Sequence, residues 1–124
     1  MKKFFLGLAA AVFVLFFIFR KSAPDPDPPR YIPMDLPVLG SNQEAAVIAH
    51  GGSIFKSAGC LNCHSLKAQK KPFTSSLDHL HEANPGYTYA WLKNPDSMRR
   101  GVKMPKPKLT EDEIISLVYL LHQE

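Results

Sequence analysis

The residues best suited to carry chemistry lie in one short segment, Cys60-Leu61-Asn62-Cys63-His64. It contains both cysteines of the chain, two residues apart, and a histidine follows the second. This spacing is the attachment signature of a c-type haem, in which both thiols bond to the porphyrin and the next imidazole binds the iron. A thioredoxin-like dithiol or a local disulfide is the alternative, but a thioredoxin motif follows a strand and here a helix is expected before it. The segment therefore predicts one covalently attached haem c, held by Cys60 and Cys63, with His64 as a metal ligand.

A second axial ligand to the iron has to come from elsewhere in the chain. Met104 is favoured because Pro105 follows it in the loop 101–109, and a proline stiffens a loop that must hold a weak thioether ligand. Methionines are commonly packing residues, and Met98 is interpreted as one of these. Loop position favours Met104 as the second metal ligand and leaves the other candidates open. These candidates are Met34, His50, His79, His81, Met98 and His122.

Three helices are expected to position these residues. Ser41-Asn42-Gln43-Glu44 is a capping box that predicts a helix from about Asn42, ended by Gly59. Thr110-Glu111-Asp112-Glu113 is a second box, and a shorter helix is predicted over Tyr87–Lys93, ended by Asn94-Pro95. No long run alternates with period two, so the predicted fold class is all-α. The expected inner face of the first helix is Ala45, Ile48, Gly52 or Ser53, and Phe55; that of the last is Ile114, Leu117, Val118 and Leu121.

An apolar run over residues 4–19 lies between two pairs of basic residues. As a helix it would be about 24 Å long, somewhat short of a hydrocarbon core of about 30 Å, and the basic side chains can reach the headgroups. No A-x-A cleavage site follows the run, so a retained anchor is favoured over a signal peptide. The sequence predicts a single N-terminal transmembrane helix over residues 1–21.

The formal net charge of +4 comes entirely from the four basic residues around that run, because the 11 that remain of 15 equal the 11 acidic residues. A concentrated basic face on the folded part is therefore not expected, which argues against a nucleic-acid binder. Residues 22–40 carry six prolines and are predicted to form a semi-rigid tether of the polyproline II type. The apolar second half of the tether would pack along a partner subunit or along the domain's own flank. Residues 41–124 are predicted to be the folded domain.

The segment 41–124 resembles a class I cytochrome c domain. The resemblance rests on Gly52-Ser53-Ile54-Phe55, Gly59-Cys60-Leu61-Asn62-Cys63-His64, Trp91-Leu92-Lys93-Asn94-Pro95, Met104-Pro105, Leu109-Thr110 and Val118-Tyr119-Leu120-Leu121. It implies a small helical domain around one covalent haem, with His64 and Met104 as iron ligands. It also implies that the first and last helices cross at Gly51 or Gly52, near Phe55 and Tyr119. Two further cofactor-binding roles follow from it: Trp91 at a haem propionate, and Pro72 offering its carbonyl to the second ring nitrogen of His64.

The function that this resemblance implies is electron transfer by a membrane-tethered monohaem c-type cytochrome, which is not an enzyme by itself. The expected partners are redox proteins or companion subunits of a respiratory or photosynthetic complex. The expected location is the bacterial inner membrane, as a single pass with the domain on the periplasmic side. A basic ring that steers an acidic partner would comprise Lys67, Lys70, Lys71, Lys103, Lys106 and Lys108. The alternative is a haem-based sensor or small peroxidase-like enzyme with a displaceable sixth ligand, in which His79, His81 or Met104 would be central.

Overall fold

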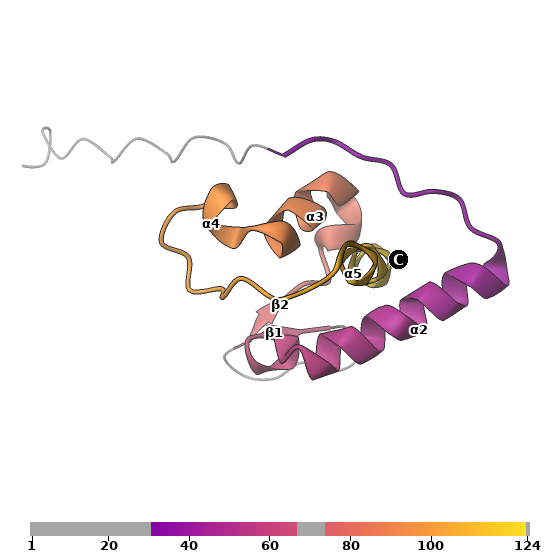
Figure 1. Cartoon of the computed structure of the whole chain (residues 1–124), viewed down its shortest axis with the longest axis horizontal. Coiled ribbons are helices and arrows are strands. Elements are labelled where there is room, and N and C mark those ends of the chain that lie inside the picture. Colours follow the sequence, from indigo (N-terminus) through magenta and orange to yellow (C-terminus); the bar gives the residue numbers. More distant parts are fainter. Residues whose placement is uncertain (1–30, 67–73, 124) are drawn as a thin grey trace, which may run out of the picture.

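The computed structural model describes residues 31–66 and 74–123, in which helices surround a small apolar core (Figure 1). The described elements are α2 (Ser41–Ser57), η1 (Cys60–Asn62), β1 (His64–Ser65), β2 (Ser75–Ser76), η2 (Leu80–Glu82), α3 (Pro85–Lys93), α4 (Pro95–Met98) and α5 (Glu111–Leu121). The largest fully buried side chains include Leu117 and Val118 of α5, which places this helix at the centre of the core.

The helix α2 begins one residue earlier than the capping box predicts. Gly40 is its N-cap, and the Gly40 N–H donates to Oε1 of Gln43 at 3.4 Å. Ser41 therefore lies inside the helix. At the other end the prediction is confirmed, because α2 ends at Ser57 and Gly59 adopts a left-handed φ of +76°. That conformation, which glycine adopts at little cost, turns the chain into the cysteine segment of η1.

The helix α5 begins as predicted. The hydroxyl of Thr110 accepts the N–H of Glu113 at 3.3 Å, and Oε2 of Glu113 accepts the N–H of Thr110 at 2.8 Å. Two N–H groups at the helix start are satisfied by this reciprocal capping box. The predicted inner face is also confirmed, since all four of its residues are buried: Ile114, Leu117, Val118 and Leu121.

The helices α2 and α5 cross in close contact, and Figure 1 shows α5 nearly end-on beside the long α2. A Cβ atom added at Gly51 would lie 2.3 Å from the carbonyl oxygen of Ser116, whereas one added at Gly52 would have no atom within 4 Å. The crossing point is therefore Gly51, one of the two predicted positions. Phe55 and Tyr119 are both buried, as expected for residues near this contact.

The inner face of α2 is predicted only in part. Phe55 is buried as expected, but Ala45 is exposed and Ile48 half-buried, while Ile54 is buried instead. The first turns of α2 project past α5, so they have no core to face (Figure 1). An amphipathic pattern locates a helix face and does not show how far along the helix its partner extends.

The helix α3 starts two residues before the predicted Tyr87. Asn84 is its N-cap: Oδ1 accepts the N–H of Gly86 at 2.9 Å and the N–H of Met34 at 3.1 Å. Pro85 occupies the first helical position, where its missing N–H costs nothing. The predicted end at Lys93 is confirmed.

Residues 31–40, here called the strap, run in extended form along α3 and α5. The hydroxyl of Tyr119 donates to the carbonyl of Pro37 at 2.5 Å, and the ring of Tyr31 packs edge-on against Tyr87 with centroids 5.6 Å apart. Of the two expectations for this apolar segment, the structure supports packing along the domain's own flank. The boundaries predicted at residues 21 and 40 stay predictions.

The all-α prediction is wrong, because His64–Ser65 and Ser75–Ser76 form a short parallel sheet. His64 lies opposite Ser75, and Ser65 lies opposite Ser76. Strands of two residues are too short to give a period-two pattern, so the sequence carried no signal for them.

The predicted membrane segment has no counterpart in the described structure. Within residues 31–66 and 74–123, no helix combines the length and the apolar character needed to cross a membrane. The described residues therefore do not support the leading transmembrane helix of the predicted fold class or the predicted single pass through the bacterial inner membrane. Residues 1–21, for which the sequence predicts the anchor, lie outside the described residues.

The crossing of α2 and α5 makes a testable prediction about two adjacent glycines. Gly51→Ala should destabilise the domain by about 1–3 kcal/mol, because the new methyl group overlaps a backbone carbonyl. Gly52→Ala should be neutral or stabilise it by up to about 1 kcal/mol, because alanine is the better helix former. Urea unfolding followed by circular dichroism measures both, and equal effects of the two substitutions would contradict the assigned crossing point.

Candidate functional site

A mainly apolar cavity of about 340 Å³ lies beside the helix crossing. Its walls come from α2, α3, α5, the segments around β1 and β2, and the loop that precedes α5. Most of the lining is contributed by carbon, from Phe55, Leu77, Leu80, Leu92, Val102 and Leu121. A cavity of this volume, with an apolar wall and a few polar groups, is the usual form of a cofactor or ligand site.

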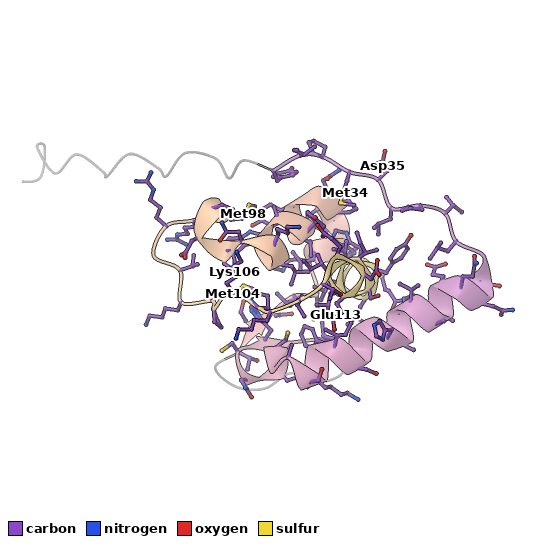
Figure 2. The ribbon with its side chains drawn as sticks, in the orientation of Figure 1. Met34, Asp35, Met98, Met104, Lys106 and Glu113 are labelled. Carbon is purple, nitrogen blue, oxygen red and sulfur yellow. The ribbon has the colours of Figure 1, made fainter. Side chains whose placement is uncertain are left out.

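Four of the predicted site residues line this one cavity: Cys60, His64, Trp91 and Met104. They come from η1, β1, α3 and the loop before α5, so only the tertiary fold brings them together. Figure 2 shows Met104 on that loop and Met98 on α4 itself. Met98 is 4% exposed and does not line the cavity, which agrees with its interpretation as a packing residue.

The imidazole of His64 has an unusual environment. Its Nδ1 atom is buried and has no hydrogen-bond partner among the described residues. Leaving a buried polar atom unpaired costs free energy, so such an atom calls for a functional or structural explanation. The partner that the resemblance suggests, the carbonyl of Pro72, lies outside the described residues, and this role stays a prediction.

The two cysteines differ in exposure. Cys60 is half-buried in the cavity wall, whereas Cys63 is exposed, and both thiols are free. Burial raises the pKa of the Cys60 thiol, and a backbone hydrogen bond offsets part of this effect. Cys60 opens the 3₁₀ turn η1, whereas Cys63 is its C-cap and lies outside the turn, so the two side chains meet different surroundings.

The other ligand candidates are separated by the fold. His79 lines the cavity, and His50 is exposed on α2. His81 is outside the cavity lining, and its Nδ1 atom lies 2.6 Å from the carbonyl oxygen of Asp78. Among the histidines proposed as alternative ligands, His79 therefore has a place at the cavity.

Trp91 packs edge-on against Tyr87, with ring centroids 6.3 Å apart, and both rings line the cavity. The propionate contact that the resemblance assigns to Trp91 stays a prediction. Of the six lysines in the predicted basic ring, Lys103, Lys106 and Lys108 are exposed on the loop that carries Met104. The other three lie outside the described residues.

Sequence reasoning missed Thr88. This residue is 3% exposed, lines the cavity, and has its Oγ1 atom 2.8 Å from Nε2 of His122. A signal for it existed, because Thr88 precedes Trp91 by three residues on a predicted helix, and residues at this spacing share a face. Burial lowers the pKa of His122, and the nearby charge of His81 lowers it further.

The predicted cofactor has no cluster of metal-binding side chains behind it in the described structure. Residues 31–66 and 74–123 contain no group of three or more His, Cys, Asp or Glu side chains that could hold a metal ion. Cys60 and His64 line the cavity, whereas Cys63 is exposed and is not among its lining residues. The predicted covalently attached haem c is therefore not supported by such a cluster, although a haem iron takes four ligands from its porphyrin and needs only one or two from the protein. The cofactor-binding and metal-ligand roles predicted for individual residues stay predictions.

Comparison with known proteins gives a distant relative. The chain is similar to cytochrome c oxidase subunit 2 of Bacillus subtilis (strain 168), with 30% identity over 93 residues, 62% of this chain and 26% of that protein. The chain thus spans about a quarter of the length of the relative it matches. No family model and no solved structure matches the chain, so its resemblance to class I cytochromes c is not confirmed.

The contrast between the cysteines predicts a difference in alkylation. With both thiols free, iodoacetamide at pH 7.5 should modify Cys63 several-fold faster than Cys60, whose thiolate is scarcer and less accessible. Peptide mass spectrometry at successive times measures both rates. Equal rates would contradict the assigned burial, and failure of both sulfurs to react after denaturation would show that they are already bonded.

The Thr88–His122 pair predicts a pH-dependent stability. The pKa of His122 is lowered from 6.5 in the folded state, so above pH 6.5 its contribution to stability is fully present. Below pH 6.5 the unfolded chain takes up the proton first, and this contribution is lost as the pH falls through the folded pKa. The difference in unfolding free energy between the wild type and His122→Asn should therefore narrow from pH 7.5 to pH 5. The exposed His50→Asn is the control, and a constant difference for His122→Asn would contradict the prediction.

Proposed function

We propose that the chain is an electron-transfer module that works with companion subunits of a respiratory oxidase, and that its redox centre is built on Cys60, Cys63, His64 and Met104. The observation that carries this proposal is the convergence of a thiol, an imidazole and a thioether on one apolar cavity. The similarity to cytochrome c oxidase subunit 2 supports the association with an oxidase.

The side chains at the cavity suit electron transfer. Thiolate, thioether and imidazole are the protein ligands that favour redox-active transition metals over hard cations such as magnesium. The unpaired Nδ1 of His64 offers a buried nitrogen that a redox group or its supporting shell could engage. The apolar wall limits access of water, and solvent access and local dielectric set the potential of a redox group.

In this proposal the chain catalyses no reaction by itself. The thiol of Cys60, the imidazole of His64 and the thioether of Met104 are assigned to the redox centre, so none of them is left to act as a nucleophile or a base in covalent catalysis. Moving an electron requires only a positioned redox group and a docking surface.

The loop that carries Met104 is a candidate docking surface. Lys103, Lys106 and Lys108 are exposed on it, and Figure 2 labels Lys106 beside Met104. A cluster of positive charge close to the redox centre would steer an acidic partner toward the shortest route for the electron. Such steering weakens as ionic strength rises.

The proposed centre is tested on the full chain purified with a tag from its own host. Optical redox titration should show one reversible one-electron couple, and Met104→Ala should shift its potential or abolish it. Met98→Leu is the matched control, because this buried methionine lies outside the cavity, and it should leave the couple unchanged. Absence of any couple in the wild type, or equal effects of both substitutions, would contradict the proposal.

The same preparation identifies the redox group and the partners. Elemental analysis reports any bound metal, and the mass of the denatured chain reports any group bonded to it. Oxidase subunits should co-purify in constant ratio under gentle extraction. Recovery of the chain alone, with full redox activity toward soluble proteins, would contradict the role as a companion subunit.

A further inference from the structure

The pair Thr88 and His122 connects the buried cavity with the surface. The hydroxyl of Thr88 belongs to the cavity wall, and its Oγ1 atom lies 2.8 Å from Nε2 of His122. His122 is half-buried at the C-terminal end of α5 and lines a second hollow of about 510 Å³, between the strap and the ends of α2 and α5. This second hollow is open to solvent, so the imidazole of His122 can exchange protons with water. One hydrogen bond, to Thr88, separates this imidazole from the cavity.

Protonation of His122 changes which part of the Thr88 hydroxyl, its hydrogen or its oxygen lone pairs, is turned toward the cavity. An imidazolium carries hydrogen on both ring nitrogens, so Nε2 must then donate to the Thr88 oxygen. The hydroxyl hydrogen of Thr88 is released from that bond and can turn toward the cavity. In neutral imidazole with Nε2 unprotonated, the hydroxyl donates to His122 and presents oxygen lone pairs instead. Protonation therefore places a positive charge on His122, next to the cavity wall, and at the same time reorients the dipole of the Thr88 hydroxyl.

We infer that His122, acting through Thr88, is a redox-linked proton site: when the redox group in the cavity gains one electron from a partner electron-transfer protein, His122 takes up one proton from the water of the surface hollow. The inference rests on the proposed function, since it requires a redox group in the cavity. The added positive charge stabilises the reduced form, and by linkage the reduced form favours the protonated imidazole equally. In this account Thr88 and His122 are positioning residues and do not bind the redox group.

The surroundings of His122 place charged and polar groups of both signs near its ring. His81 on η2 opposes the charged form, and burial lowers the pKa of His122 in the same direction. Glu44 on α2 carries a negative charge and lines the same hollow, and the free carbonyl groups at the end of α5 present partial negative charge there. Tyr119, also at this hollow, is engaged by the carbonyl of Pro37. Negative charge gained by a redox group in the cavity would oppose the lowering of the His122 pKa and favour uptake of a proton.

The inference is tested by measuring the midpoint potential of the full chain between pH 5 and pH 8. In the wild type the potential should fall as the pH rises through the range in which His122 loses its proton. His122→Gln should keep the couple but flatten this dependence, and Thr88→Val should weaken it while preserving side-chain shape. His50→Gln, on the exposed face of α2, should retain the wild-type slope.

A further variant, His81→Gln, and NMR of the His122 ring distinguish a change in proton uptake from a folding defect. His81→Gln removes an opposing charge, so the pH-dependent range should move to higher pH. Resonances of the His122 ring should report a higher pKa in the reduced than in the oxidised chain. An unchanged slope in His122→Gln, or a potential independent of pH in the wild type, would overturn the inference and leave the proposed function standing. Failure to find any couple would instead overturn the proposed function.

Discussion

The close approach of α2 and α5 at Gly51 is the contact on which the rest of the structure depends. With no side chain at this position, the backbone of α2 lies against the carbonyl of Ser116. The crossing fixes the C-terminal end of α2, from which Gly59 turns the chain into the cysteine segment. It also fixes the start of α5 and so the loop that carries Met104. One backbone contact thereby sets the distance between the two sides of the cavity.

The other walls of the cavity pack against this pair of crossed helices. The helix α3 contributes Thr88 and Trp91, and its contact with α5 carries the hydrogen bond between Thr88 and His122. On the outside the strap is tied to the same two helices through Tyr119 and Tyr87. The polar link and the strap therefore converge on the C-terminal end of α5. At this end of α5 the hydrogen bond between Thr88 and His122 joins the cavity wall to the surface hollow.

Local sequence signals predicted the helices because each helix is encoded by neighbouring residues. The box at Thr110, the stop at Gly59 and the break after Lys93 are short-range patterns, and the structure contains all three. The sheet formed by β1 and β2 could not be predicted, because its pairing joins residues about ten positions apart through strands of two residues. The burial of α2 was only partly predictable, since it depends on where α5 crosses it.

For the site, the sequence named residues that the structure brings together, Cys60, His64 and Met104. It could not supply what tertiary contacts decide, namely the exposure of Cys63, the unpaired Nδ1 of His64 and the hydroxyl of Thr88 in the wall. The identity of the cofactor is a further step: the motif alone led to the haem assignment, and the described residues contain no cluster of metal-binding side chains that supports it.

The central claim is that Met104 shares one redox centre with Cys60 and His64. Carbon-13 labelling of the methionine methyl groups, followed by NMR of the oxidised and reduced full chain, tests it most directly. The account predicts a large change in the Met104 resonance with redox state and little change in those of Met34 and Met98. An unmoved Met104 resonance, or a larger change at Met98, would contradict it.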